Sequence, residues 1–307
     1  MRRGLISWSK EEVPATALEA RVRKLQQALR AEGLDAVFAY TSFPRPAAVS
    51  WLTHFVPYWS EALLAVLPQG APSLLASLTK RVHPWIREVS HLGEIVPAPS
   101  LGRAAATFAK EKKLNRIGVV DLADLPWPVA EPLGERLVDF TESFARLRQP
   151  PDAHENALAE RAAQIAERAL ASVPQQAWRT SEILAAAEQA ARLEGAEEVI
   201  PRIIDPKSIE LSVAYKGTWT RLGRTRNASA EAQAWFQAAL QGSGEPPPGE
   251  LKRRTVESCV GSAPLAVVEN AGKIYRRLPR GARAVLSVEL ELDSGAWFGA
   301  APFVVRA

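Results

Sequence analysis

The chain has 307 residues, of which 47% are hydrophobic and 23% charged, and its formal net charge is +4 at pH 7. A chain of this length and composition folds as a globular protein with room for two domains, which excludes an extended disordered chain. Its basic residues are scattered and form no stripe interleaved with aromatic residues, so we expect no nucleic-acid partner.

The first half of the chain alternates between predicted helices and strands. Residues 19–32 place apolar side chains at helical spacing, and Gly33 supplies a C-terminal stop. We expect a loop at residues 49–54, which read Val-Ser-Trp-Leu-Thr-His. The other expected elements are a helix at residues 104–113 and strands at residues 34–40, 61–67, 73–78 and 116–121. This alternation is typical of a layered α/β domain.

A domain boundary is predicted after Arg148, where Pro150 and Pro151 precede a long alanine-rich helix at residues 152–173. Paired prolines fix the entry of a helix but cannot lie inside it. We therefore divide the chain into residues 1–148 and 149–307. In the second part we expect helices at residues 180–193 and 227–240, a flexible break at residues 242–249, and a strand at residues 283–289.

The numbers of cysteine and histidine residues, and the lengths of the apolar stretches, exclude further classes of protein. The single cysteine, Cys259, excludes an intramolecular disulfide, and four scattered histidines exclude a Cys/His zinc cluster. No stretch reaches the roughly 20 apolar residues of a membrane span, and residues 1–10 lack the apolar run of a signal peptide. We expect a cytoplasmic protein without a membrane partner.

The most informative segment is residues 210–225, in which Glu210 precedes Gly217, Arg221, Arg224 and Thr225. This spacing resembles the metal-binding strand pair of the creatinase/prolidase/aminopeptidase P family, the pita-bread hydrolases. The family pattern reads Asp, ten residues, Asp, two residues, Arg-Thr. The resemblance implies an α/β fold with an amino-terminal creatinase-like layered domain followed by a shortened pita-bread domain.

Intact members of that family hold two divalent ions with two aspartates, one histidine and two glutamates. The resemblance places Glu210 and Arg221 at the aspartates and Glu289 at the first glutamate, with alanine at the last. No histidine follows His154, and Cys259 is the nearest candidate for that place. A guanidinium offers no lone pair to a metal. We therefore expect no metal, no cofactor and no intact catalytic set.

Three functional hypotheses follow from this remnant pocket. The first is a catalytically degenerate, metal-free protein, a pseudoenzyme that binds a small molecule, a peptide or a protein partner. It would act as a homodimer or as a subunit beside an active homologue. The second is a metal-independent hydrolase of a C–N bond that uses the residual carboxylates. The third is an Xaa-Pro metallopeptidase, which the missing ligands disfavour.

Each candidate site residue can also have a purely structural role. Glu210 and Glu289 can pair with Arg221 or Arg224 and form a salt-bridged core, and Cys259 can be an inert apolar residue. Residues at family pocket elements can instead be core or surface residues. These pocket candidates are Trp51, His54, Trp219, Arg224 and Trp297.

Overall fold

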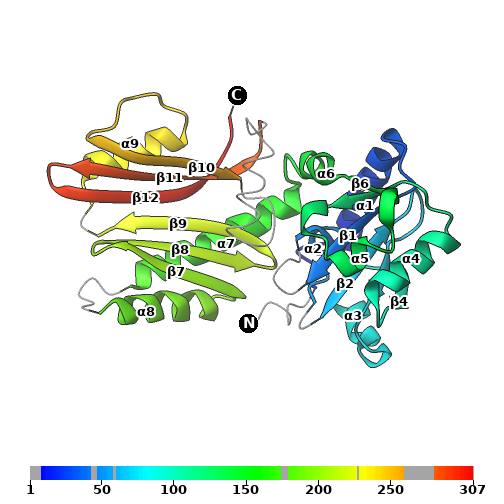
Figure 1. Cartoon of the computed structure of the whole chain (residues 1–307). Coiled ribbons are helices and arrows are strands. Elements are labelled where there is room, and N and C mark those ends of the chain that lie inside the picture. Colours follow the sequence, from blue (N-terminus) through cyan, green and yellow to red (C-terminus); the bar gives the residue numbers. More distant parts are fainter. Residues whose placement is uncertain are drawn as a thin grey trace. The chain divides into compact units, whose positions relative to one another are not determined.

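The computed structural model describes residues 8–42, 47–57, 60–173, 179–226, 228–258 and 280–306. The chain forms two compact units that meet in sequence between Arg148 and Gln149 (Figure 1). Each unit contains a six-stranded sheet with its own helices, so the predicted α/β class is confirmed. No helix in the described parts of the chain is both long and apolar enough to cross a membrane.

The first unit is built on a mixed sheet with the strand order β4-β3-β2-β1-β5-β6. The central strand β1 pairs antiparallel with β2 and parallel with β5. The strands are β1 (Ala36–Ser42), β2 (Glu61–Val66), β3 (Ser73–Ala76), β4 (Ile95–Pro97), β5 (Ile117–Val120) and β6 (Leu137–Asp139).

Helices cover both faces of this sheet, which explains why β1 is apolar on both sides. Val37 and Ala39 pack in a core with residues of α1, α2 and α6, whereas Phe38 packs with Phe108 of α4 in a second core. A strand buried on both faces reads as a continuous apolar run. The helices are α1 (Ala15–Ala31), α2 (Ala47–Thr53), α3 (His83–Val89), α4 (Leu101–Glu111), α5 (Trp127–Ala130) and α6 (Thr141–Leu147).

One element of this unit differs from the prediction. Trp51, Leu52 and Thr53, expected in a loop, end the helix α2, and His54 follows with a positive φ of 64°. Val49 and Leu52 are fully buried against the core. Burial of these apolar side chains stabilises a helical turn that the short local pattern does not reveal.

The second unit contains an antiparallel sheet with the order β10-β11-β12-β9-β8-β7. Its strands are β7 (Glu198–Asp205), β8 (Ser208–Tyr215), β9 (Thr218–Thr225), β10 (Glu250–Ser258), β11 (Arg283–Leu292) and β12 (Gly295–Val304). Its helices are α7 (Ala153–Ser172), α8 (Thr180–Leu193) and α9 (Ala230–Leu240). The long helix begins at a capping box, in which Asp152 accepts from the Glu155 amide at 2.8 Å.

The two faces of this sheet have different environments. Ile209, Leu211 and Val213 pack with α7 and α8, and Leu286 and Leu290 pack with α9. Side chains alternate between faces along a strand. The intervening residues therefore form a second face, which we call the polar face. It includes Glu210 and Ser212 of β8, Trp219 and Arg221 of β9, Ser287 and Glu289 of β11, and Arg253 and Glu257 of β10.

Candidate functional site

The hairpin formed by β8 and β9 sets the geometry of the polar face. Its turn is Lys216-Gly217, with positive φ values of 49° and 76°, as a two-residue hairpin turn requires. The carboxylate of Glu197 accepts hydrogen bonds from both turn amides, at 2.7 Å from Lys216. The resulting register places Ser212 opposite Arg221. This register puts Glu210 and Arg221 on one face.

Glu197 is itself a buried acid, with 3% of its surface exposed. Desolvation raises the pKa of Glu197 above its usual range, and the hydrogen bonds from the Gly217 and Lys216 amides offset part of that effect. The carboxylate lies at the turn and not in the polar face, so its role is structural.

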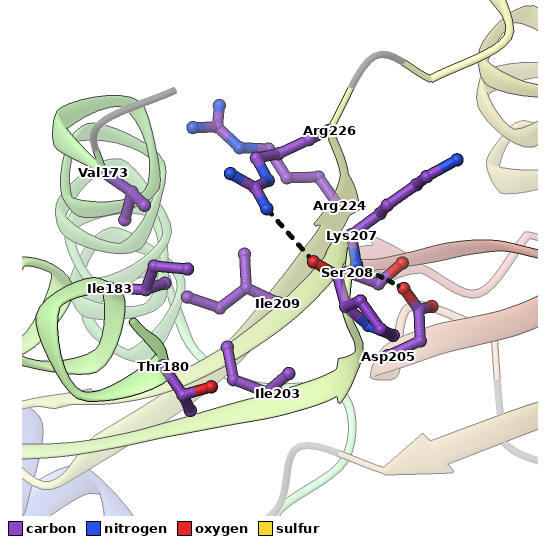
Figure 2. A pocket seen from close by; sticks show the side chains of 11 residues that line it. Val173, Thr180, Ile183, Ile203, Asp205, Lys207, Ser208, Ile209, Arg224 and Arg226 are labelled. Carbon is purple, nitrogen blue, oxygen red and sulfur yellow. Dashed lines mark hydrogen bonds between the residues drawn. The ribbon is translucent and has the colours of Figure 1, made fainter. Parts of the chain in front are cut away.

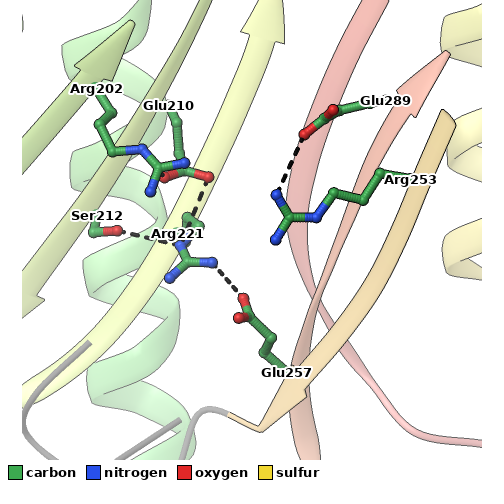
Figure 3. Close-up of polar contacts among 7 residues, drawn as sticks. All are labelled: Arg202, Glu210, Ser212, Arg221, Arg253, Glu257 and Glu289. Carbon is green, nitrogen blue, oxygen red and sulfur yellow. Dashed lines mark hydrogen bonds and ion pairs between the residues drawn. The ribbon is translucent and has the colours of Figure 1, made fainter. Parts of the chain in front are cut away.

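Arg221 lies at the centre of a polar cluster (Figure 3). Its Nε lies 3.3 Å from Ser212 Oγ and 3.9 Å from a carboxylate oxygen of Glu210, and its Nη1 donates to Glu257. On the other side of Glu210, Arg202 Nε lies 3.4 Å from the carboxylate. Glu210 and Arg221 are 5% and 8% exposed. The buried Glu210 carboxylate is thus flanked by two guanidinium groups.

Glu289 belongs to a separate pair on the same face. It lies opposite Arg253 in the β10–β11 ladder, with the guanidinium 3.8 Å from its carboxylate. Figure 3 shows this pair apart from the cluster around Arg221. The expected pairing of Glu289 with Arg221 or Arg224 is therefore wrong: its partner is Arg253.

Arg224 and Thr225 have structural contacts elsewhere in the domain. Arg224 lies opposite Ile209, on the helix side of the sheet, and its guanidinium donates to the carbonyl of Leu170 in α7. Thr225 Oγ1 lies 2.7 Å from Ser208 Oγ and accepts from the Phe298 amide at 2.7 Å. The Arg-Thr pair thus joins β9 to its neighbours and to α7.

The aromatic candidates are distributed over different environments. Trp219 is 4% exposed and shares the polar face with Arg221. Trp297 packs edge to face against Phe236 of α9, with ring centroids 5.5 Å apart, and is a core residue on the helix side.

In the first unit, Trp51 lies between the guanidinium groups of Arg21 and Arg148, at 5.4 and 5.3 Å from its ring centroid. His54, which follows α2, is 7% exposed. The contacts with Arg21 and Arg148 account for Trp51 within the first unit. Cys259 lies outside the described residues.

One member of the cluster was absent from the sequence prediction. Glu257 contacts Arg221 from β10, a strand that the sequence analysis did not predict. The segment from Glu250 to Ser258 is rich in charge, and its apolar residues, Leu251 and Val256, do not alternate with polar ones as in a half-buried strand. The local sequence therefore gave no clear signal for this strand.

The donor set does not fit a dinuclear metal centre. Two hard cations require several carboxylates with lone pairs free for coordination, whereas both Glu210 and Glu257 already contact the Arg221 guanidinium. Within the described ranges, no group of three or more His, Cys, Asp or Glu residues is arranged to hold a metal. A cation near Glu210 would also meet the positive charges of Arg202 and Arg221.

Comparison with known proteins agrees with this architecture. Residues 21–149 match the sequence model of the family described as Creatinase/Prolidase N-terminal domain. No curated protein sequence matches the chain significantly.

Several solved structures share the fold of both units. The Xaa-Pro dipeptidase from Bacillus anthracis is similar with a TM-score of 0.68 and 15% identity, covering 94% of this chain and 95% of that chain. The prolidase from Pyrococcus furiosus has a TM-score of 0.62 and 13% identity, covering 92% and 96%. Zinc-substituted aminopeptidase P from E. coli, in complex with product, has a TM-score of 0.63 and 10% identity, covering 98% and 94%.

These matches define a two-domain protein of the creatinase-like α/β class. By sequence, residues 21–149 belong to the family described as Creatinase/Prolidase N-terminal domain, and both units have the fold of the solved prolidase, Xaa-Pro dipeptidase and aminopeptidase P structures. The resemblance predicted from residues 210–225 is therefore confirmed by the sequence of the first unit and by the fold of both units. At these sequence identities the structural matches establish the fold alone.

Proposed function

We propose that the protein is a catalytically degenerate, metal-free member of this family that binds a small molecule or peptide. One observation carries the proposal: Arg221 lies between Glu210 and Glu257 on the face where the family resemblance places metal ligands. A guanidinium at that position donates hydrogen bonds and cannot coordinate a cation. The charges of the carboxylates are therefore offset by protein groups.

The partly exposed groups of the polar face support a binding role. The side chains of Arg202, Arg253 and Glu289 are 53%, 62% and 38% exposed. Both charge signs are thus accessible to a ligand on this face. Electrostatic complementarity of this kind orients small polar ligands.

The second hypothesis, a metal-independent hydrolase of a C–N bond, requires two carboxylates within reach of one substrate atom. Glu210 is engaged by Arg202 and Arg221, and Glu289 by Arg253. A carboxylate must be able to exchange a proton with the substrate to serve as a general acid or base. The arginine partners count against this reaction, and the degenerate binding protein remains the preferred proposal.

The test is elemental analysis of the purified full chain combined with a peptidase assay. We expect no stoichiometric Mn, Co, Zn or Fe, and no cleavage of Xaa-Pro dipeptides with or without added metal. Stoichiometric metal with Xaa-Pro cleavage would establish the metallopeptidase hypothesis instead. Metal-free cleavage of a C–N bond that is lost in Glu289→Gln would support the hydrolase hypothesis.

We further propose that the chain acts as a homodimer or as a subunit beside an active homologue. A protein without catalytic ligands can contribute to an enzyme by supplying a surface or a binding site to its partner. Light scattering of the purified chain, alone and after co-expression with a catalytic family member, measures this directly. A monomer in both preparations would contradict the proposal.

A further inference from the structure

A second site lies on the other side of the carboxyl-terminal sheet from Arg221. A cavity of about 350 Å³ opens between the end of α7, the start of α8 and the strands β7, β8 and β9. Ile209 and Arg224 line it, and both lie on the helix side of the sheet. Its volume falls at the lower end of the range for small-molecule sites. The cavity is therefore distinct from the polar face and large enough for a small ligand.

The cavity has an apolar wall and a basic wall (Figure 2). Figure 2 shows aliphatic side chains together on one side and the two arginines beside them, with Lys207 extending away from the arginines. The aliphatic residues are Val173, Ile183, Ile203 and Ile209, and the basic residues are Lys207, Arg224 and Arg226. An arrangement of this kind matches a ligand with an aliphatic body and an anionic head.

The basic residues that line the cavity outnumber its one acidic lining residue. Asp205 is the acidic residue among the lining residues, and its carboxylate accepts the Lys207 amide at 2.7 Å. Arg224 forms no ion pair with any carboxylate in the described residues, and its recorded hydrogen bond goes to the Leu170 carbonyl. Three cations against one carboxylate leave the lining with a net positive charge.

The environment of Arg224 strengthens the argument for an anion. Burial lowers the pKa of the Arg224 guanidinium, and the negative charge of Glu167 opposes this shift. A partly desolvated guanidinium interacts strongly with an anion, because few water molecules compete for its donors. Its planar pair of N–H groups matches the two oxygens of a carboxylate.

We propose that this cavity binds a small amphipathic carboxylate, with the aliphatic chain against the isoleucines and the carboxylate against Arg224. The nearby Arg226 donates to the Pro206 carbonyl at 3.1 Å and holds the turn between β7 and β8 in place. This hydrogen bond fixes the backbone of the turn that lines the basic side of the cavity. Binding of a ligand at this site does not involve the residues of the polar face.

The test is calorimetric titration of the full chain with octanoate, hexanoate, octylamine and inorganic phosphate. We expect octanoate to bind with one-to-one stoichiometry and hexanoate to bind more weakly, by about fourfold for each methylene group removed. Octylamine, which has the same chain and the opposite charge, is expected not to bind. Equal binding of octylamine, or phosphate binding as tight as octanoate binding, would overturn the proposal.

Substitutions at arginine residues and NMR spectra of the isoleucine methyl groups test whether octanoate binds in this cavity. Arg224→Met is expected to weaken octanoate binding by at least about tenfold, whereas Arg254→Met, a change at an exposed arginine of β10, leaves it unchanged. Isoleucine methyl spectra are expected to shift at residues 183, 203 and 209 on titration. Unchanged affinity in Arg224→Met, or an equal loss in Arg254→Met, contradicts the site.

A further variant tests the site if Arg224→Met fails to fold. Thr180 is exposed at the rim of the cavity. Thr180→Trp is expected to block the cavity and abolish octanoate binding while thermal unfolding stays the same. Unchanged octanoate binding in this variant contradicts the proposal. Because no step involves a metal or Xaa-Pro cleavage, failure here is distinguishable from failure of the proposed function.

Discussion

At the scale of single residues, Arg221 decides the chemistry of the polar face. Its guanidinium remains protonated and presents several N–H donors in one plane. It contacts Ser212, Glu210 and Glu257 while only 8% exposed. A carboxylate in its place would leave Glu210 and Glu257 beside a third negative charge. The arginine therefore stabilises this arrangement without a metal ion.

We expect Arg221→Met to lower the free energy of unfolding by about 2–4 kcal/mol, because it leaves two carboxylates without a shared partner. The loss stays at this level because Arg202 still pairs with Glu210 and Glu257 is partly exposed. Urea unfolding followed by circular dichroism measures the change. The matched control is Arg254→Met, for which a change within about 0.5 kcal/mol is expected. Equal effects of the two variants would contradict a stabilising role for the cluster.

At the scale of elements, the β8–β9 hairpin shows which parts of the site were predictable. The sequence located the hairpin and the residues that share its face, because Gly217 and the spacing to Arg224 fix a short turn. It did not identify Arg202, Arg253 or Glu257 as partners. Arg202 comes from β7, which pairs with β8, and Arg253 and Glu257 come from β10, which two strands separate from β9 in the sheet. Local patterns contain no register for such pairings.

The hairpin turn also gives the protein a specific pH dependence. Because the pKa of Glu197 is raised in the folded state, its contribution to stability is fully present below the usual glutamate range. That contribution is lost as the pH rises through the elevated pKa. We expect the free energy of unfolding to fall more between about pH 5 and about pH 8 in the natural protein than in Glu197→Gln. Urea unfolding at both pH values measures this difference, and parallel pH profiles would refute the assignment.

At the scale of the whole molecule, two units with separate cores carry the family fold. The first has helices on both faces of a mixed sheet, and the second has helices on one face of an antiparallel sheet. The fold thus persists although the described residues contain no donor set for two metal ions. Fold and chemistry are separable in this way because a site depends on a few side chains, whereas the fold depends on many buried ones.

The proposed absence of a bound metal ion has a measurable consequence for stability. A ligand that binds the folded state at about 100 times its Kd adds about 2.7 kcal/mol to the free energy of unfolding. We expect EDTA and added Mn²⁺ to leave the midpoint of thermal unfolding unchanged. Differential scanning calorimetry checks this result. A rise of several degrees with Mn²⁺ that EDTA reverses would show that a metal site contributes to folding.

The sequence by itself determined the family, the α/β class and the substitution of arginine for a potential metal ligand. These features depend on residue identity and on spacing along one hairpin. Only the tertiary structure decided that Glu257 completes the cluster, that Glu289 pairs with Arg253, and that Arg224 lines a cavity behind the sheet. The physical reason is that these contacts join strands and helices far apart in the chain. Their register is set by packing of the whole sheet and not by local propensity.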